Sequence, residues 1–242
     1  MTIAAKPPTI GITTPNAKGL VQPEAADIFR GRVNVETEGV NVEQLSLAGY
    51  DEALARMPAA IDRLIARGAQ AIVINGTSLS FAYGRQFHDD MVDSIRQRTG
   101  LPVTTMAESL VNGLKALGAE RVVLATAYDE SVTDLLGAFL RSHDIAAETG
   151  ACLGVVENAK LRALVSQDII DLALRAAAGR KMDALVISCG NLRTIPLTTQ
   201  LEAHFGVPVV SSALVGVWGA LRLVGIDDPL PGCGRLFELA PA

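Results

Sequence analysis

Aromatic and basic residues are scarce in this chain of 242 residues. Phe, Trp and Tyr together make up 4% of it, and the formal net charge is −5. Proteins that bind nucleic acid rely on basic surfaces and on aromatic stacking, so this composition argues against a nucleic-acid partner. Hydrophobic residues make up 49% and charged residues 19%, which supplies enough apolar material for a sizeable core.

Long apolar runs are also lacking. No run approaches the roughly 18 residues that would span a bilayer. Pro7 and Pro8 interrupt the N-terminal segment before the apolar stretch of a secretory signal could develop. We therefore expect a cytoplasmic protein without a membrane partner.

Cysteine and histidine are few and scattered. The three cysteines and three histidines form no Cys-x-x-Cys and no histidine pair, so a disulfide framework and a zinc site are both disfavoured. A metal centre and a hydrolase triad lose support for the same reason. We expect no metal site.

Short apolar runs alternate with amphipathic stretches along the chain, which is typical of an α/β fold with a mostly parallel sheet. The runs predict strands over 9–13, 32–36, 71–74, 103–105, 122–125, 184–187 and 207–210. Apolar positions spaced three and four apart predict helices over 23–30, 49–67, 86–98, 107–117, 130–142, 159–178, 197–204 and 212–223.

An internal repeat organises these elements. Residues 64–78 resemble 176–191, and residues 99–105 resemble 205–211. The repeat predicts two pseudosymmetric α/β lobes, each a mostly parallel sheet flanked by helices, with the active site in the cleft between them. We place the lobes at 1–118 and 119–225, followed by a tail over 226–242 that packs back on the lobes.

Ligands of open α/β sheets bind beyond the carboxyl ends of the strands. This rule nominates the turns at 14–19, 76–80, 126–130 and 188–194. Gly76, Thr77 and Ser78 supply backbone N–H groups and two hydroxyls that could cradle an anion, although helix capping is the commoner role of such residues. Tyr128 could bind a carboxylate or enolate oxygen, or it could simply be a partly buried tyrosine at a sheet edge.

Cys189 ends an apolar strand and precedes Gly190, at the pseudo-equivalent of Gly76. A buried cysteine is usually a small core residue, but N–H dipoles at this turn could tune the pKa of a thiol that faces the cleft. A nucleophilic thiol would need a histidine within reach, and none lies in the four turns. We therefore interpret Cys189 as a proton donor.

Four segments together resemble the arylmalonate decarboxylase family of the aspartate/glutamate racemase superfamily, which also holds maleate cis-trans isomerases and hydantoin racemases. They are GTSLSF at 76–81, LATAY at 124–128, SCG at 188–190 and GVPVVSS at 206–212. The similarity runs nearly from end to end. The superfamily fold is two pseudosymmetric α/β lobes with the site between them, in agreement with the repeat.

The resemblance implies an activity and a site. The activity is cofactor-independent, asymmetric decarboxylation of a 2-substituted (aryl)malonate, a small carboxylate, without metal, biotin or other cofactor. Thr77, Ser78, Tyr128, Cys189 and the Gly190 backbone would bind one carboxylate in a dioxyanion hole, and Cys189 would protonate the enediolate that remains after CO₂ leaves. Further substrate-binding positions implied by the resemblance are Pro15, Asn16, Val42, Leu45, Gly76, Leu79, Asn158 and Leu161.

Two departures from the family pattern bear on the activity. Racemases and maleate isomerases of the superfamily carry two cysteines, and Gly76 stands where the first would be, which favours decarboxylation. Asn16 and Asn158 stand at positions that resemble apolar ones of the decarboxylase, and Asn158 is similar to a carboxylate-binding asparagine of maleate isomerases. The alternatives are therefore an isomerase-like or racemase-like enzyme that has lost one cysteine, or a non-catalytic protein that binds small carboxylates. The sequence does not specify the oligomeric state.

Overall fold

The computed structural model describes residues 6–161 and 163–239. It contains two four-stranded sheets in which every pairing is parallel. The first sheet has the order β2-β1-β3-β4, with β1 (Thr9–Thr14), β2 (Asn34–Gly39), β3 (Ala71–Ile74) and β4 (Val103–Thr105). The second has the order β6-β5-β7-β8, with β5 (Arg121–Thr126), β6 (Ala146–Cys152), β7 (Ala184–Ser188) and β8 (Val209–Ser211). The second order repeats the first, which confirms the predicted α/β fold with two pseudosymmetric lobes.

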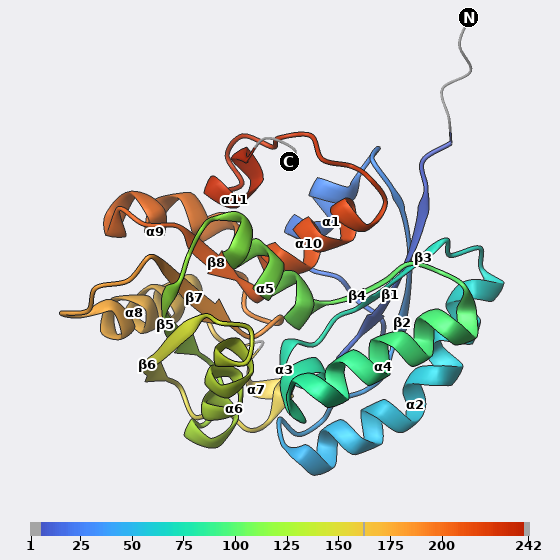
Figure 1. Ribbon diagram of the computed structural model, residues 1–242, viewed down its shortest axis with the longest axis horizontal. Coiled ribbons are helices and arrows are strands. Elements are labelled where there is room, and N and C mark those ends of the chain that lie inside the picture. Colours follow the sequence, from blue (N-terminus) through green and yellow to red (C-terminus); the bar gives the residue numbers. More distant parts are fainter. Residues whose placement is uncertain (1–5, 162, 240–242) are drawn as a thin grey trace, which may run out of the picture.

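Helices flank both sheets (Figure 1). They are α1 (Pro23–Phe29), α2 (Leu47–Ala66), α3 (Thr77–Phe81), α4 (Gly84–Thr99), α5 (Met106–Ala116), α6 (Glu130–Arg141), α7 (Asn158–Leu161), α8 (Ser166–Ala177), α9 (Thr198–Phe205), α10 (Ser212–Leu223) and α11 (Arg235–Glu238), with a 3-10 turn at Ile195–Leu197. Helix α5 packs on α10, and α10 also contacts β4, so the two halves meet through equivalent helices. The lobe boundaries at 118 and 225 remain a prediction.

The burial of the inner strands β3 and β7 explains why apolar runs in the sequence predicted them. Every residue of β3 and of β7 is buried, because helices cover both faces of a parallel sheet. Helices α5 and α10 then begin directly after β4 and β8. The Thr105 hydroxyl accepts the Glu108 N–H at 2.9 Å, and the Ser211 hydroxyl accepts the Leu214 N–H at 3.2 Å. These caps start both helices at the strand ends, where a ligand is expected to bind.

Two predicted elements were wrong in detail, and the short helices α3 and α11 were not predicted. The predicted helix at 159–178 is two helices, α7 and α8, because the Asp168 carboxylate accepts the Val165 N–H and starts a new helix there; residue 162 lies outside the described residues. The predicted strand at 32–36 lies at Asn34–Gly39 instead. Strand β6 was missed, since its sequence AAETGAC lacks an apolar run and most of its residues are partly or fully exposed. Strand β8 begins after Pro208, as its missing N–H predicts.

Within residues 6–161 and 163–239, no helix has both the length and the apolar character needed to cross a membrane.

The C-terminal segment packs back through one buried carboxylate. Glu202 on α9 accepts the Arg235 N–H at 3.0 and 3.1 Å, one bond to each carboxylate oxygen, and it accepts the Val209 N–H at 3.1 Å. Burial raises the pKa of Glu202, while these N–H groups and the charge of Arg235 act in the opposite direction. Leu236 lies against Gly113 of α5, where an added Cβ would come within 3.2 Å of its Cδ2. The segment therefore contacts both halves of the molecule.

Replacing Glu202 with alanine should lower the free energy of unfolding by about 1–3 kcal/mol, since it leaves buried N–H donors without acceptors. Chemical denaturation measures this loss. The exposed Glu238→Ala is the matched control and should stay within about 0.5 kcal/mol of the wild type. Equal stability of the two variants would contradict the anchoring role of Glu202.

Candidate active site

A row of buried hydroxyls joins four separate segments of the chain. Thr77, at the start of α3, donates to Ser212 Oγ at 2.7 Å. Ser212 Oγ lies 3.2 Å from Ser188 Oγ, and Ser188 donates to Tyr128 Oη at 3.3 Å. All four side chains are buried. The structure thus brings the predicted Thr77 and Tyr128 together through Ser188 and Ser212, of which only Ser188 lies in a nominated turn.

The backbone conformation of Gly76 allows the sharp turn that positions Thr77 and Ser78. Its φ of 124° and ψ of 87° lie where a residue with a side chain would be strained. The chain can therefore turn from β3 directly into α3, which begins with Thr77 and Ser78. The predicted Leu79 is buried beside Gly76, with its Cβ 3.3 Å from the point that a Cβ on Gly76 would occupy.

Cys189 follows β7 and is buried, with 4% of its surface exposed. Burial raises the pKa of its thiol to about 11, although the N–H groups of Asn191 and Leu192 and the Tyr128 hydroxyl act to lower it. The thiol is therefore protonated at neutral pH. A protonated thiol can donate a proton and is a poor nucleophile.

Tyr50, near the start of α2, is a fully buried residue of the same cluster that the sequence analysis missed. Burial strongly raises the pKa of its hydroxyl, the Ser78 hydroxyl lowers it, and the charge that Cys189 would carry as a thiolate raises it further. Its Oη makes no hydrogen bond of normal length to any described residue. The pKa of the Tyr128 hydroxyl is also raised, mainly by burial and secondly by the charge that Cys189 would carry as a thiolate. Both tyrosines are thus neutral hydroxyl donors beside the thiol.

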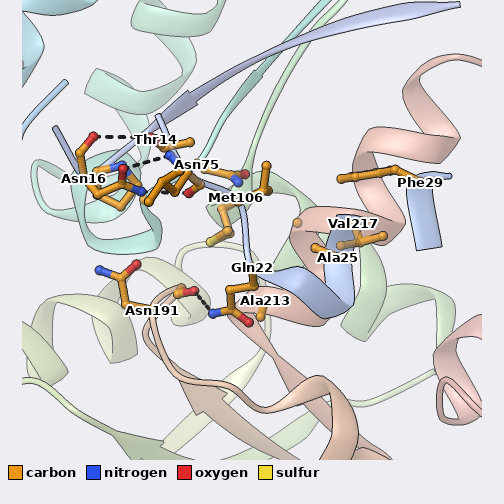
Figure 2. A pocket seen from close by; sticks show the side chains of 16 residues that line it. Thr14, Asn16, Gln22, Ala25, Phe29, Asn75, Met106, Asn191, Ala213 and Val217 are labelled. Atoms are coloured by element: carbon orange, nitrogen blue, oxygen red, sulfur yellow. Dashed lines mark hydrogen bonds between the residues drawn. The ribbon is translucent and has the colours of Figure 1, made fainter. Parts of the chain in front are cut away.

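A pocket opens next to the two glycine turns (Figure 2). Four residues predicted to bind substrate line it, namely Pro15, Asn16, Gly76 and Gly190. Its other lining residues were not predicted, and they include Gln22, Asn75, Met106 and Asn191. Thr77 Oγ1 lies 3.0 Å from Met106 Sδ, which ties the pocket wall to the row of hydroxyls.

Asn16 lies on the pocket wall, but its amide is engaged within its own loop. Its Oδ1 accepts the N–H groups of Lys18 and Leu20, at 3.2 and 2.8 Å, and its Nδ2 donates to the Leu20 carbonyl at 2.7 Å. This is the local role that asparagine commonly has in turns. Its contribution to substrate binding remains a prediction.

Two segments from opposite halves meet beside the pocket. Asn158 is buried, donates from Nδ2 to the Val42 carbonyl at 2.8 Å, and accepts from Asn191 Nδ2. The Leu45 N–H donates to the Val156 carbonyl at 2.8 Å. Val42 and Asn158 line a second hollow that also includes Pro15 and Asn16, whereas Leu161 lines a third that shares Asn16 and Asn191. The side chain of Leu45, whose N–H makes this backbone hydrogen bond to Val156, is buried.

The sequence signals for the missed residues differ in strength. Asn75 and Asn191 flank the nominated glycines, so their place in the chain could have nominated them. Tyr50, Gln22 and Ser212 come from the starts of three helices, and only tertiary packing brings them to the site.

Among the residues that the structure describes, no group of three or more His, Cys, Asp or Glu side chains could hold a metal ion. His88 is buried in the first half, where its ring nitrogens pair with Asp89 at 2.8 Å and with Thr105 at 2.9 Å. Its partners give it a structural role at the start of α5.

Taken together, the fold and the site define a two-lobed α/β enzyme that presents one protonated thiol beside a cluster of neutral hydroxyls. Comparison with known proteins assigns the chain to a family. Residues 10–237 match the arylmalonate decarboxylase family, and the chain belongs to this family. The predicted resemblance is confirmed, and the chain is an enzyme of the carboxy-lyase class, as expected.

Individual relatives agree with this placement. The chain is 36% identical to arylmalonate decarboxylase from Bordetella bronchiseptica, over 97% of this chain and 98% of that protein. It is 27% identical to maleate isomerase from Nocardia farcinica, over 95% of each. A crystal structure of an arylmalonate decarboxylase mutant in a liganded form, with one glycine changed to cysteine and one cysteine to serine, superposes with a TM-score of 0.89 at 36% identity. That superposition covers 96% of this chain and 99% of the other.

Proposed function

We propose that this enzyme decarboxylates a 2-substituted malonate without a cofactor, and that Cys189 delivers the proton that completes the reaction. The observation that carries the proposal is the buried Cys189 thiol, with a pKa of about 11, in the same cluster as the hydroxyls of Tyr50, Ser78 and Tyr128. Relatives in the family act on arylmalonates by name, which supports the same substrate class here.

The first step breaks the bond between the α-carbon and one carboxylate. The electron pair stays on the α-carbon and delocalises into the remaining carboxylate, which becomes an enediolate as CO₂ leaves. The hydroxyls of Thr77, Ser78 and Tyr128 and the Gly190 N–H are the proposed donors to its two oxygens. Fixed donors that meet charge only as it develops stabilise the transition state more than the ground state.

The second step transfers the Cys189 proton to the α-carbon from one face, which makes the product a single enantiomer. The resulting thiolate takes a proton back from solvent before the next turnover. Gly76 has no side chain, so it supplies no second acid on the opposite face. Val42, Leu45, Leu79 and Leu161 are the proposed apolar residues around the departing carboxylate.

The direct test is to incubate the enzyme with 2-methyl-2-phenylmalonate and to follow CO₂ release and the enantiomers of 2-phenylpropionate. Maleate, aspartate and glutamate are assayed in parallel. Turnover of maleate, or racemisation of the amino acids, without CO₂ release from the malonate would favour the isomerase-like or racemase-like alternative. Malonate binding without turnover would favour a non-catalytic binding protein.

The pH dependence should follow the Cys189 thiol. Because the protonated form is the donor and burial raises its pKa from 9.0 to about 11, activity should persist through pH 9 and fall as the pH rises through about 11. The measurement is kcat/KM across the alkaline range, with circular dichroism at each pH to show that the protein remains folded. An alkaline limb near 9 in folded protein would contradict a buried donor.

A further inference from the structure

The pocket beside Gly76 and Gly190 has a mostly apolar wall with no charged side chain among the described residues that line it. The apolar part of the wall includes Val21, Ala25, Phe29, Met106, Ala213 and Val217. In the view of Figure 2, Met106 lies between Asn75 on one side and Gln22 on the other, and Phe29 lies at the far end. Such a wall suits an aromatic or other apolar group.

Two amide oxygens interrupt this wall. Gln22 Oε1 and Asn75 Oδ1 are both buried, and neither makes a hydrogen bond to any residue that the structure describes. Folded proteins rarely leave buried acceptors without a donor, and such groups often mark a function. Asn16, which lines the same pocket, differs in that both ends of its amide bond to its own loop.

The orientation of Gln22 follows from its other end. Its Nε2 donates to the Gly190 carbonyl at 2.7 Å and to the Leu192 carbonyl at 3.0 Å (Figure 2 shows the first). Since carbonyl oxygens can only accept hydrogen bonds, the end of the amide that faces them must be the NH₂ group, and the amide oxygen is the end left without a partner. Gln22 therefore presents an acceptor while its nitrogen holds the turn that follows Cys189.

Asn75 presents its oxygen toward α10. Asn75 Oδ1 lies 3.4 Å from the point that a Cβ on Gly216 would occupy, and the same point is 2.7 Å from Met106 Cε. A larger residue at 216 would clash with Met106 and crowd the amide. Gly216 thus keeps open the space between Asn75 and α10.

We propose that this pocket receives the 2-substituent of the substrate, and that this substituent is an aromatic group carrying neutral hydroxyl or N–H donors, for Asn75 Oδ1 and for Gln22 Oε1. The proposal rests on the decarboxylase function proposed above and specifies its substrate. The donors are neutral because the pocket wall offers no carboxylate to pair with an ammonium group, and an unpaired buried charge is costly. An unsubstituted phenyl group would leave both acceptors without a partner.

The test compares malonates that differ only by a hydroxyl against a methyl group. The substrates are 2-methyl-2-arylmalonates with 3-hydroxyphenyl, 3-methylphenyl, 4-hydroxyphenyl or 4-methylphenyl groups, so both ring positions are sampled. The readout is the hydroxyl-to-methyl ratio of kcat/KM, in the wild type and in Asn75→Leu, a replacement of similar size without an acceptor. Intrinsic electronic effects of the substituents cancel when the two enzymes are compared.

At one ring position or the other, the ratio should fall at least tenfold in Asn75→Leu, and it should be unchanged in the exposed control Asn34→Leu. Release of CO₂ from all four malonates, with ratios within threefold in wild type and Asn75→Leu, would overturn this inference and leave the proposed function standing. No CO₂ from any of them would overturn the proposed function itself.

A binding measurement covers the case in which Asn75→Leu does not fold. Calorimetry on the wild type compares hydroxybenzylphosphonates with methylbenzylphosphonates at the same two ring positions. At least tenfold tighter binding of one hydroxyl compound than of its methyl partner supports the inference. Equal Kd values at both positions overturn it.

Discussion

Cys189→Ala should lower the kcat of decarboxylation by about 10²- to 10⁴-fold, the range over which a positioned proton donor contributes to catalysis. The thiol is the proposed source of the proton, no histidine lies in the described turns around it, and the Asp129 carboxylate in the 126–130 turn is engaged as the acceptor of the Val132 N–H. Cys189→Ser should be impaired as well, because a serine hydroxyl is a much weaker acid than a thiol. Steady-state kinetics and product enantiomer ratios measure both effects.

Matched controls come from the same chain. Cys152 and Cys233 are both free and only partly buried, and their alanine variants should retain wild-type turnover. The Kd of a benzylphosphonate should stay within about threefold of wild type in Cys189→Ala, since the proposed hydroxyl donors remain. Turnover by Cys189→Ala at the wild-type rate would remove the proposed acid. Loss of inhibitor binding together with turnover would instead indicate a damaged site.

Thr77→Val should lower kcat by about 10²- to 10³-fold, the cost of removing one donor to a developing oxyanion. Valine has nearly the shape of threonine, so the buried site keeps its packing while it loses the hydroxyl that faces Ser212 and Met106. The loss should appear mainly in kcat, because the donor acts on charge that develops in the transition state.

Thr13→Val is the control for this change. Thr13 is a fully buried threonine of β1 whose hydroxyl makes no hydrogen bond to any described residue. Its replacement should leave kcat unchanged and should not lower stability, since it removes a polar group without a partner. If Thr77→Val and Thr13→Val had the same kcat in folded protein, Thr77 would not be an oxyanion donor.

The turns nominated at the strand ends show how much of the site local sequence can predict. Gly76, Thr77 and Ser78 follow a strand whose four residues are all buried, with only Asn75 between, and Cys189 and Gly190 directly follow another. A strand of this kind must be covered on both faces, so its carboxyl end is one of few places where polar groups can meet a ligand. Sequence alone could therefore nominate these turns, and the fold agrees with the order of elements that it predicted.

Tyr50, Ser212 and Gln22 show where that reasoning stops. They lie at the starts of three helices, and their local sequences are those of ordinary helix starts. Gln22 and Ser212 reach the site because α1 and α10, from opposite halves, pack against each other, and Tyr50 reaches it because α2 packs on β1, β2 and α3. The exact contacts depend on side-chain packing over sequence separations such as the 168 residues between Gln22 and Gly190.

The sequence by itself determined the alternation of strands and helices, the repeated halves, and the glycine turns that hold the thiol and the hydroxyls, because each follows from local periodicity and backbone conformation. Only the tertiary structure decided which of those groups lie together in one buried site and what the pKa of the thiol becomes. Burial and hydrogen bonding between distant segments set both, and neither is encoded in any single stretch of the chain.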